Sequence, residues 1–254
     1  LFNGRATKVI FDYVVATPTL WASQVNIDLL GFGKDDIPAE VIAARNSQHN
    51  ITSCKIFYPL KELYWEQGSK IPQILVTDTF AQDAYGVHWG DGRGAMLLSY
   101  TWEDDAAKLL PEDDIELAAL MLTELDKITM DTVGENLSDY LDTETPPTVI
   151  HWSRQPYARG CAKLYRQRNW SLNYSLLAYN QTQSADSNLY FAGENYGVEG
   201  GWTEPALRLS IDAVINILRN SGGTFNNNFS PSDSYPSYDT SFAPDNKYPP
   251  AALR

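Results

Sequence analysis

Cysteine and histidine, which build most thiolate and metal sites, are scarce in this sequence. Its 254 residues contain only Cys54 and Cys161, which excludes a disulfide framework and a cluster of thiolate ligands. Two buried thiols are favoured, with a single disulfide as the alternative. The three histidines, His49, His88 and His151, lack the spacing of metal ligands. We therefore expect no metal site, and a structural place for His151 is favoured over one that lines a functional site.

The sequence also lacks long hydrophobic runs and an excess of positive charge. No run of about 18 apolar residues occurs, so we expect no membrane-spanning helix. The first 15 residues enter a strand pattern directly, without the basic and then apolar order of a signal peptide. Lys and Arg number 19 against 32 Asp and Glu, and the net charge is −13. Nucleic acid is excluded as a partner, because phosphate binding needs a basic face.

Aromatic residues, by contrast, are abundant. Phe, Trp and Tyr make up 12% of the chain, with 7 Trp and 15 Tyr. Such side chains line many sites for flat organic ligands, although a large core is the favoured explanation.

Six Asn-X-Ser/Thr sequons exceed the number expected by chance, which is about two for this composition. They begin at Asn50, Asn136, Asn169, Asn173, Asn180 and Asn228. The excess indicates a secretory route, with a cytoplasmic location as the alternative.

Hydrophobic periodicity predicts both strands and helices. Five stretches have the pattern of strands: 8–16, 54–59, 74–78, 95–101 and 147–152. We expect the second, third and fourth of these to form an antiparallel sheet. Helices are expected over 37–44 and from near Pro111 to Ile128, where the acidic run 112–114 suits the positive end of a helix dipole.

The stretch FAGENYGVEGGWTEPALRLSIDAVINIL, residues 191–218, predicts a strand, a glycine-rich turn and a helix. The strand covers 189–192, and the helix begins near Thr203. Apolar and small residues recur on one face of that helix: Ala206, Leu207, Ser210, Ile211, Val214, Ile215 and Leu218. A helix N-terminus presents free N–H groups and partial positive charge, so we expect an electron-rich ligand in front of it. The alternative is that the glycines only turn the chain.

This signature resembles the C-terminal flavin-binding segment of the FAD-dependent amine oxidases, particularly the L-amino acid oxidases. GGWTEPAL is most similar to the L-phenylalanine oxidase type. Three further blocks follow the family's order: SCKIFYPLKELYW (53–65), TDTFAQDAY (77–85) and VIHWSRQPYARG (149–160).

The resemblance implies an α/β fold, the C-terminal half of a two-domain flavin amine oxidase, with part of a Rossmann-like FAD domain and a mixed-sheet substrate-binding domain. Residues 1–30 would return a strand to the FAD domain, and residues 31–147 would form the substrate-binding domain. Residues 148–220 would complete the C-terminal part of the FAD domain. The Pro-, Ser-, Asn- and Tyr-rich tail, 221–254, would lie ordered on the body or on a partner chain.

The same resemblance implies residues that bind FAD. Gly193 and Glu194 would lie at the cofactor, with Glu194 at its ribityl and phosphate region. Gly201, Trp202 and Thr203 would lie along the isoalloxazine, where the helix dipole faces N1 and the C2 carbonyl. Two aromatic residues of the 149–160 block would pack near the flavin: Trp152 and Tyr157.

On the substrate side, the resemblance implies that Lys55 holds a water near flavin N5, with a surface lysine as the alternative. Tyr85 would donate its hydroxyl to the substrate carboxylate, and Gly201 and Trp202 would wall the pocket. The implied reaction is the oxidative deamination of an L-amino acid by O₂ to a 2-oxo acid, ammonia and hydrogen peroxide. The alternatives are an amino-acid 2-monooxygenase, which yields an amide, and a non-catalytic flavoprotein subunit.

The family's G-x-G-x-x-G segment has no counterpart in this sequence. GFGKDD follows no clean strand, and GDGRGA has the wrong glycine spacing. We therefore expect a heteromer, in which a second polypeptide from the same proteolytically processed precursor carries the N-terminal FAD-binding half. We also expect the assembled protein to form a homo-oligomer.

Overall fold

The computed structural model describes residues 8–27, 39–164, 188–197 and 199–226, together with residues 166, 169, 172, 175, 176 and 179. The chain divides into two compact units. Unit 1 combines Leu1–Asn50 with Ala162–Arg254, and unit 2 is Ile51–Cys161. These limits differ from the expected ones at 31 and 147, and each unit is described by itself below.

The shifted limits follow from packing. The helix over Ala39–Ser47 buries Val41 and Ala44 in the core of unit 1, whereas the strand over Thr148–His151 pairs with the sheet of unit 2. Of the expected tail, 221–226 is described and the remainder lies outside the described residues.

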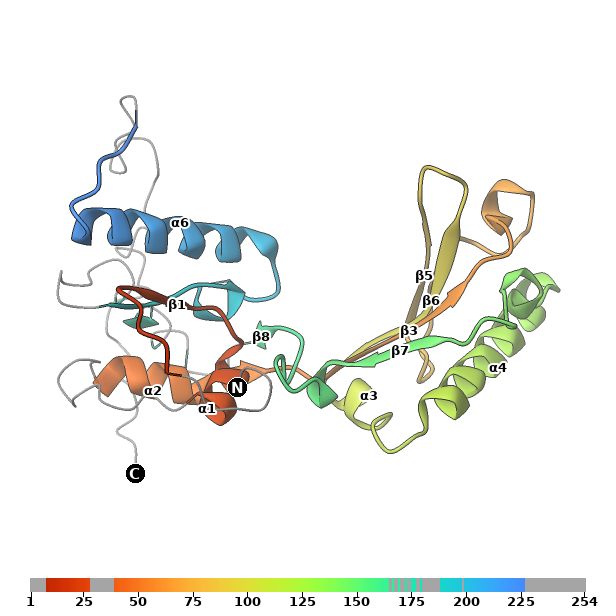
Figure 1. The fold of residues 1–254 in the computed structure, drawn as a ribbon. Helices are drawn as coiled ribbons and strands as arrows, with labels where there is room; N and C mark the ends of the chain where they lie inside the picture. Colours follow the sequence, from red (N-terminus) through yellow and green to blue (C-terminus); the bar gives the residue numbers. More distant parts are fainter. Residues whose placement is uncertain are drawn as a thin grey trace. The chain divides into compact units, whose positions relative to one another are not determined.

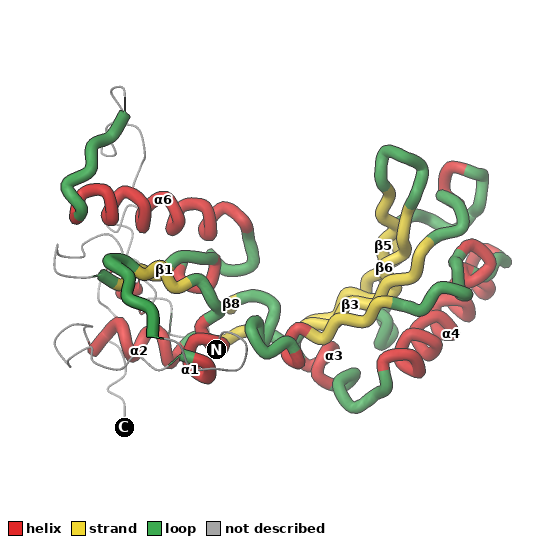
Figure 2. The backbone as a smooth tube through the Cα atoms, viewed as in Figure 1, coloured by secondary structure: helices red, strands yellow, loops and turns green. Residues whose placement is uncertain are grey.

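Unit 2 is built on a five-stranded antiparallel sheet with the strand order β4-β5-β6-β3-β7 (Figures 1 and 2). The strands are β3 (Ser53–Pro59), β4 (Ile74–Val76), β5 (Asp83–His88), β6 (Gly94–Trp102) and β7 (Thr148–His151). The expected antiparallel sheet is confirmed. Strand β5 was not expected, because Gly86 at its centre reads as part of a turn. In the sheet a Cβ at Gly86 would clash with the Trp65 ring.

Helix α4 (Asp114–Val133) lies along one face of this sheet (Figure 1). Its buried side chains pack with alternate residues of β3, Cys54, Ile56 and Tyr58, in one hydrophobic core. The helix starts three residues after Pro111, because the Asp113 carboxylate accepts hydrogen bonds from the N–H groups of Ile115 and Glu116. The expected place of the acidic run at the positive end of this helix is confirmed. The other short helical segments of unit 2 are α3 (Asp104–Ala107), η1 (Tyr64–Glu66), η2 (Leu137–Tyr140) and η3 (Trp152–Arg154).

In unit 1 a two-stranded parallel sheet lies between α6 and the α1–α2 pair (Figure 1). The sheet pairs β1 (Val14–Ala16) with β9 (Leu189–Phe191). The helices are α1 (Leu20–Asn26), α2 (Ala39–Ser47), η4 (Glu194–Tyr196) and α6 (Thr203–Asn220), and β2 (His49–Asn50) pairs antiparallel with β8 (Lys163–Leu164). The strand expected over 8–16 is confirmed only from Val14, because β9 offers a partner of just three residues.

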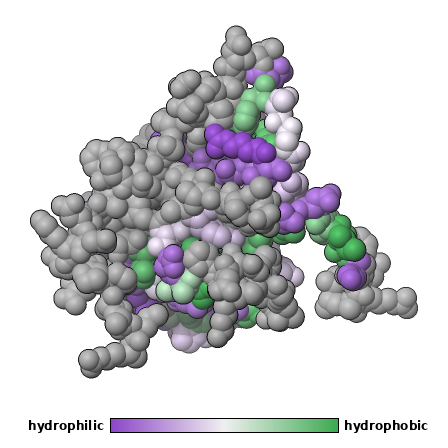
Figure 3. Space-filling model, turned by 90° about the vertical axis from the view of Figure 1, so that its left-hand side faces the viewer, coloured by the Kyte–Doolittle hydropathy of each residue, from purple (hydrophilic) through white to green (hydrophobic). Residues whose placement is uncertain are grey.

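Helix α6 has apolar side chains on two faces. Leu209, Ala213 and Ile215 are buried in unit 1. The residues of the expected apolar repeat point largely the other way, because Leu207, Ile211 and Val214 are 55%, 40% and 56% exposed. We call these three residues the outer stripe of α6. On the face drawn in Figure 3, hydrophobic and hydrophilic side chains of described residues lie interspersed.

The sequence predicts no membrane-spanning helix and no metal site, and it favours two thiols over a disulfide. Each of these expectations can be compared with the described part of the chain. Within it, no helix combines the length and apolar character needed to cross a bilayer. No group of three or more His, Cys, Asp or Glu in those residues could hold a metal ion. Cys54 is buried and Cys161 half-buried, and the two form no disulfide with each other.

Candidate functional site

The glycine turn between β9 and α6 is held by the carboxylate of Glu194. One oxygen, Oε1, accepts hydrogen bonds from the N–H groups of Lys163 and Gly201, both at 2.8 Å. The other, Oε2, accepts from the side-chain amide of Asn195, whose own oxygen accepts from Leu20 N at 3.0 Å. Glu194 therefore ties β8, η4, the start of α1 and the end of the turn together. A carboxylate has about four acceptor sites, so one remains for another donor.

Glycines in this turn are required by close packing as well as by conformation. Gly193 and Gly201 have φ angles of +115° and +81°, which other residues rarely adopt. A Cβ on Gly200 would clash with the main chain of Lys163. The segment that packs closely against Gly200 is therefore β8, which contains Lys163. Sequence reasoning had expected the glycines either to admit a ligand or to turn the chain.

The N-terminus of α6 opens on a pocket of about 620 Å³. Trp202 occupies the N-cap position, and its side chain makes no capping hydrogen bond. The indole is 73% exposed. The pocket is lined by Lys163, Leu164, Glu199, Gly200, Trp202, Thr203 and Glu204. Three residues expected at the cofactor, Gly201, Trp202 and Thr203, thus lie in or beside one pocket at the positive end of a helix.

In unit 2 the sheet register brings Lys55 and Tyr85 onto one face. Lys55 is opposite Tyr100, and Tyr100 is opposite Asp83. In the next row, Phe57, Leu97 and Tyr85 are opposite one another on successive strands. Opposite residues in an antiparallel pair point to the same side, and this side is opposite to that of the α4 core. We call it the open face of the sheet.

Polar contacts already engage both of these side chains. The Lys55 ammonium lies 4.4 Å from the centre of the Tyr100 ring, within the range of a cation–π interaction. The Tyr85 hydroxyl donates a 2.8 Å hydrogen bond to Asp83. This bond, followed by partial burial and the Asp83 charge, raises the pKa of Tyr85. Tyr85 would have to exchange Asp83 for a substrate carboxylate to serve the expected role.

The open face carries a second pocket of about 620 Å³. Its lining is mostly apolar: Phe57, Pro59, Val87, Trp89, Arg93, Gly94, Ala95, Thr148 and Ile150. The one cation in that lining, Arg93, is paired with Asp91 at 2.7 Å. Sequence reasoning missed this pocket, because its residues come from four strands and from the turn between β5 and β6, and only the register shows that the strand residues share a face.

Trp152 and Tyr157 lie in the segment that follows β7. The Trp152 carbonyl accepts hydrogen bonds from Gln155 N and Gly160 N, at 3.2 and 3.1 Å. Its indole Nε1 is buried without a hydrogen-bond partner, which is uncommon in folded proteins. Tyr157 is 80% exposed and so is not packed into unit 2.

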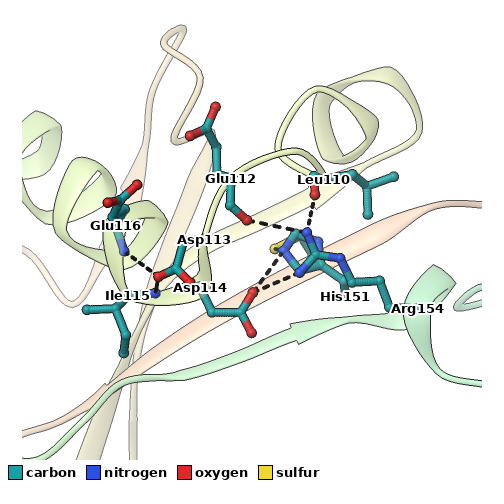
Figure 4. Close-up of polar contacts among 9 residues, drawn as sticks. Leu110, Glu112, Asp113, Asp114, Ile115, Glu116, His151 and Arg154 are labelled. Carbon is teal, nitrogen blue, oxygen red and sulfur yellow. Dashed lines mark hydrogen bonds and ion pairs between the residues drawn. The ribbon is translucent and has the colours of Figure 1, made fainter.

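The N-terminus of α4 holds this segment through Asp114 (Figure 4). The Asp114 carboxylate lies 2.9 Å from an Arg154 nitrogen and 3.8 Å from His151 Nε2. Arg154 also donates to the carbonyls of Leu110 and Glu112. His151 is buried, and burial, followed by the Arg154 charge, lowers its pKa. His151 therefore has the structural place that the sequence favoured.

Cys54 lies beside His151, with 3.8 Å between Sγ and Nε2. A cysteine nucleophile needs a base on one imidazole nitrogen and an orienting carboxylate on the other. Here Cys54 and Asp114 both meet Nε2. Burial, followed by the Asp114 charge, raises the pKa of Cys54 to about 12. The cluster is therefore structural rather than a nucleophilic site.

Comparisons with known proteins match this chain to flavoproteins. A family model described as "Flavin containing amine oxidoreductase" matches residues 2–218. The chain belongs to this family. The L-phenylalanine oxidase type that the sequence suggested is not confirmed.

Relatives of this amine oxidoreductase chain include two enzymes named tryptophan 2-monooxygenase. The one from Pseudomonas savastanoi is 28% identical over 84% of this chain and 40% of its own length. The one from Pantoea agglomerans pv. gypsophilae is 30% identical over 86% of this chain and 40% of its own length. The chain thus spans well under half the length of these curated relatives.

Solved structures share the fold of this amine oxidoreductase chain. Cyclohexylamine oxidase from Brevibacterium oxydans IH-35A has a TM-score of 0.63 at 12% identity, and it is covered over 43% of its length by 83% of this chain. An A394C mutant of putrescine oxidase has a TM-score of 0.60 at 14% identity, with 82% of this chain covering 43% of that one. The expected α/β fold of a flavin amine oxidase, present in part, is confirmed.

The residues of this amine oxidoreductase chain fit a flavin, in agreement with the expected FAD. In unit 1 the positive end of α6 opens on a pocket beside an exposed indole, which suits an electron-rich ring.

Proposed function

We propose that this chain is the C-terminal part of an FAD-dependent enzyme that oxidises L-amino acids at the Cα–N bond. The observation that carries the proposal is the N-terminus of α6, which opens beside Trp202 on a pocket. The turn before it resembles the flavin-binding segment of the family to which the chain belongs. In this proposal, unit 1 supplies the FAD-binding part and unit 2 supplies the substrate-binding part.

FAD would be held in unit 1 by the turn and the first residues of α6. Gly193, Gly201, Trp202 and Thr203 would lie along it, and the helix dipole would favour negative charge on the ring. Glu194 would act mainly by holding the turn, with its remaining acceptor site toward the ribityl chain. From unit 2, two aromatic residues would pack near the ring: Trp152 and Tyr157. When bound, FAD supplies the capacity to accept a hydride from Cα and to pass both electrons to O₂.

The substrate would meet the open face of unit 2. Tyr85 would donate its hydroxyl to the substrate carboxylate after releasing Asp83. Lys55 would hold the water that is needed near the reacting atoms. The mostly apolar pocket around Phe57 and Trp89 suits an apolar side chain, because its one cation is already paired. Holding Cα in line with the hydride acceptor would supply much of the rate acceleration.

Two outcomes of this chemistry are candidates. An oxidase converts an L-amino acid, O₂ and water into a 2-oxo acid, ammonia and hydrogen peroxide. A 2-monooxygenase converts the amino acid and O₂ into an amide with one carbon fewer, CO₂ and water. The similar Pseudomonas and Pantoea enzymes are both named tryptophan 2-monooxygenase. These names support the monooxygenase reaction as the alternative to the oxidase reaction.

Product analysis tests the proposal and separates its two forms. The assembled protein should be yellow, and its flavin absorbance should bleach when an L-amino acid is added without oxygen. With oxygen, peroxide and ammonia would identify the oxidase, and CO₂ with amide would identify the monooxygenase. A flavoprotein that no L-amino acid bleaches would be a non-catalytic subunit, which would contradict the proposal.

The assembled protein should contain a second polypeptide with the G-x-G-x-x-G half, from the same precursor, and should form a homo-oligomer. Among the described residues, β1 pairs only with β9, and Val14 and Val15 of β1 are 45% and 41% exposed. Parallel sheets are normally covered on both faces, and two strands alone are marginally stable. A further parallel strand beside β1 and a cover for the outer stripe of α6 would complete the sheet.

A further inference from the structure

The side chain of Lys163 is buried at the base of the glycine turn. Lys163 lies on β8 and is 0% exposed. Its side-chain Nζ donates a hydrogen bond to the carbonyl of Gly197, the first glycine after η4. A buried amine is costly unless its hydrogen bonds are satisfied. Its presence here therefore calls for a reason beyond filling space.

Lys163 contacts the turn at three separate points. Its side chain binds Gly197, its main chain packs against Gly200 too closely to admit a Cβ, and its N–H binds Glu194. Glu194 in turn holds Gly201 N at 2.8 Å. All three glycines between η4 and α6 are thus fixed to one residue of β8, either directly or through one carboxylate.

The fixed turn ends at the first residue of α6. Gly201 is followed by Trp202 at the N-cap and by Thr203 in the first turn. The direction of the helix N-terminus therefore depends on where β8 holds the turn. Lys163 and Leu164 of β8 also line the pocket in front of that terminus.

We propose that Lys163 is a positioning residue that fixes the glycine turn 197–201 through Gly197 and so aims the N-terminus of α6 at the bound cofactor. Only the second part of this inference, the aiming of α6 at the cofactor, rests on the proposed function. The first part, the fixing of the turn by Lys163, concerns unit 1 alone. Among the residues that the structure describes, the charged groups that face this lysine or its pocket are Glu194 on η4, Glu199 in the turn and Glu204 in α6.

The substitution Lys163→Met tests this role. Methionine fills a similar volume and removes the buried amine, so thermal stability should stay unchanged or rise. The turn should loosen nevertheless. We expect amide exchange in peptides covering 197–203 to become roughly tenfold faster or more, since a fixing hydrogen bond contributes about 1.4 kcal/mol or more to local closure. The affinity of the assembled protein for FAD, followed by flavin fluorescence, should fall by a similar factor.

Two further variants keep the test decisive. Lys127→Met changes an exposed lysine on α4 and should leave both readouts at their wild-type values. Gly200→Ala pushes the turn off β8 with the lysine intact, and it should reproduce the faster exchange even if Lys163→Met does not fold.

Unchanged exchange at 197–203 in both Lys163→Met and Gly200→Ala would overturn the positioning role. A wild-type assembly that binds no FAD would overturn the proposed function, while the exchange data would still decide the role of Lys163. Faster exchange with unchanged FAD affinity would overturn the last step, the aiming of α6 at the cofactor.

Discussion

At the scale of single residues, Lys163 makes the stability of the chain depend on pH. Burial lowers the pKa of its amine from 10.5 to about 7, and Glu194 opposes that shift. The unfolded chain therefore binds more protons than the folded chain between about pH 7 and 10.5. It follows that unfolding free energy should rise with pH across this window, by at most about 1.4 kcal/mol per pH unit.

Urea unfolding at pH 7, 8 and 9 checks this prediction, with Lys163→Met as the reference. Methionine has no proton to lose, so the wild type should gain stability relative to the variant at each step. A difference between the two proteins that does not change with pH would show that the amine stays protonated in the fold over this range, as in the unfolded chain.

The charge of Asp114 affects the pKa of a neighbouring residue, His151, more than it affects the stability of the fold. Asp114 is half exposed, as is Arg154, so the ion pair contributes about 0–1 kcal/mol. Its charge, however, raises the pKa of His151 against the lowering by burial and by Arg154. Asp114→Asn should therefore lower the pKa of His151 further. An NMR titration of the imidazole measures it, with Asp131→Asn on the same helix as the control; a rise would contradict the arrangement in Figure 4.

At the scale of secondary-structure elements, β5 depends on a glycine that the sequence presents as a breaker. A Cβ at Gly86 would clash with the Trp65 ring, which packs on the core of unit 2. Gly86→Ala should therefore reduce the unfolding free energy by about 1–3 kcal/mol. Gly90→Ala is the matched control, because nothing lies within 4 Å of a Cβ there. Equal midpoints of chemical unfolding for the two variants would mean that Trp65 moves aside freely.

Elements were predictable from the sequence where local signals decide the structure. Helix α4 was located to within a few residues, since Pro111, the acidic run and the apolar period all point to it. Strand β9 and the start of α6 were also located, because a short apolar run ends in glycines and then gives way to a helical period. The family signature was readable for the same reason, as it lies within one such stretch.

Features that depend on pairing between distant segments were not predictable. The shared face of Lys55 and Tyr85 depends on bulges, at which Phe57 pairs with Leu97 and the register of β5 also shifts. Spacing along one strand carries no information on such shifts. Lys163 gave no signal either, because a lysine in a short polar strand is usually exposed.

At the scale of the whole molecule, the sequence could not show which apolar face of α6 is turned inward, because both faces repeat with a helical period. The structure buries Leu209, Ala213 and Ile215 and leaves the outer stripe exposed. An exposed apolar stripe of this kind is typical of a surface that another polypeptide covers. This links the fold to the length comparison, in which the chain spans 40% of its relatives.

The outer stripe provides the last prediction. Leu207→Asp and Ile211→Asp change exposed positions, so each should alter the unfolding free energy of the chain by no more than about 0.5 kcal/mol. Each should nevertheless abolish co-purification with the proposed second polypeptide, which would carry the G-x-G-x-x-G half, because a buried unpaired carboxylate is costly in an apolar interface. Leu120→Asp, at an exposed apolar position of α4, should leave co-purification intact. Retained association in the two α6 variants, measured by sedimentation of the purified complex, would show that the second polypeptide binds elsewhere.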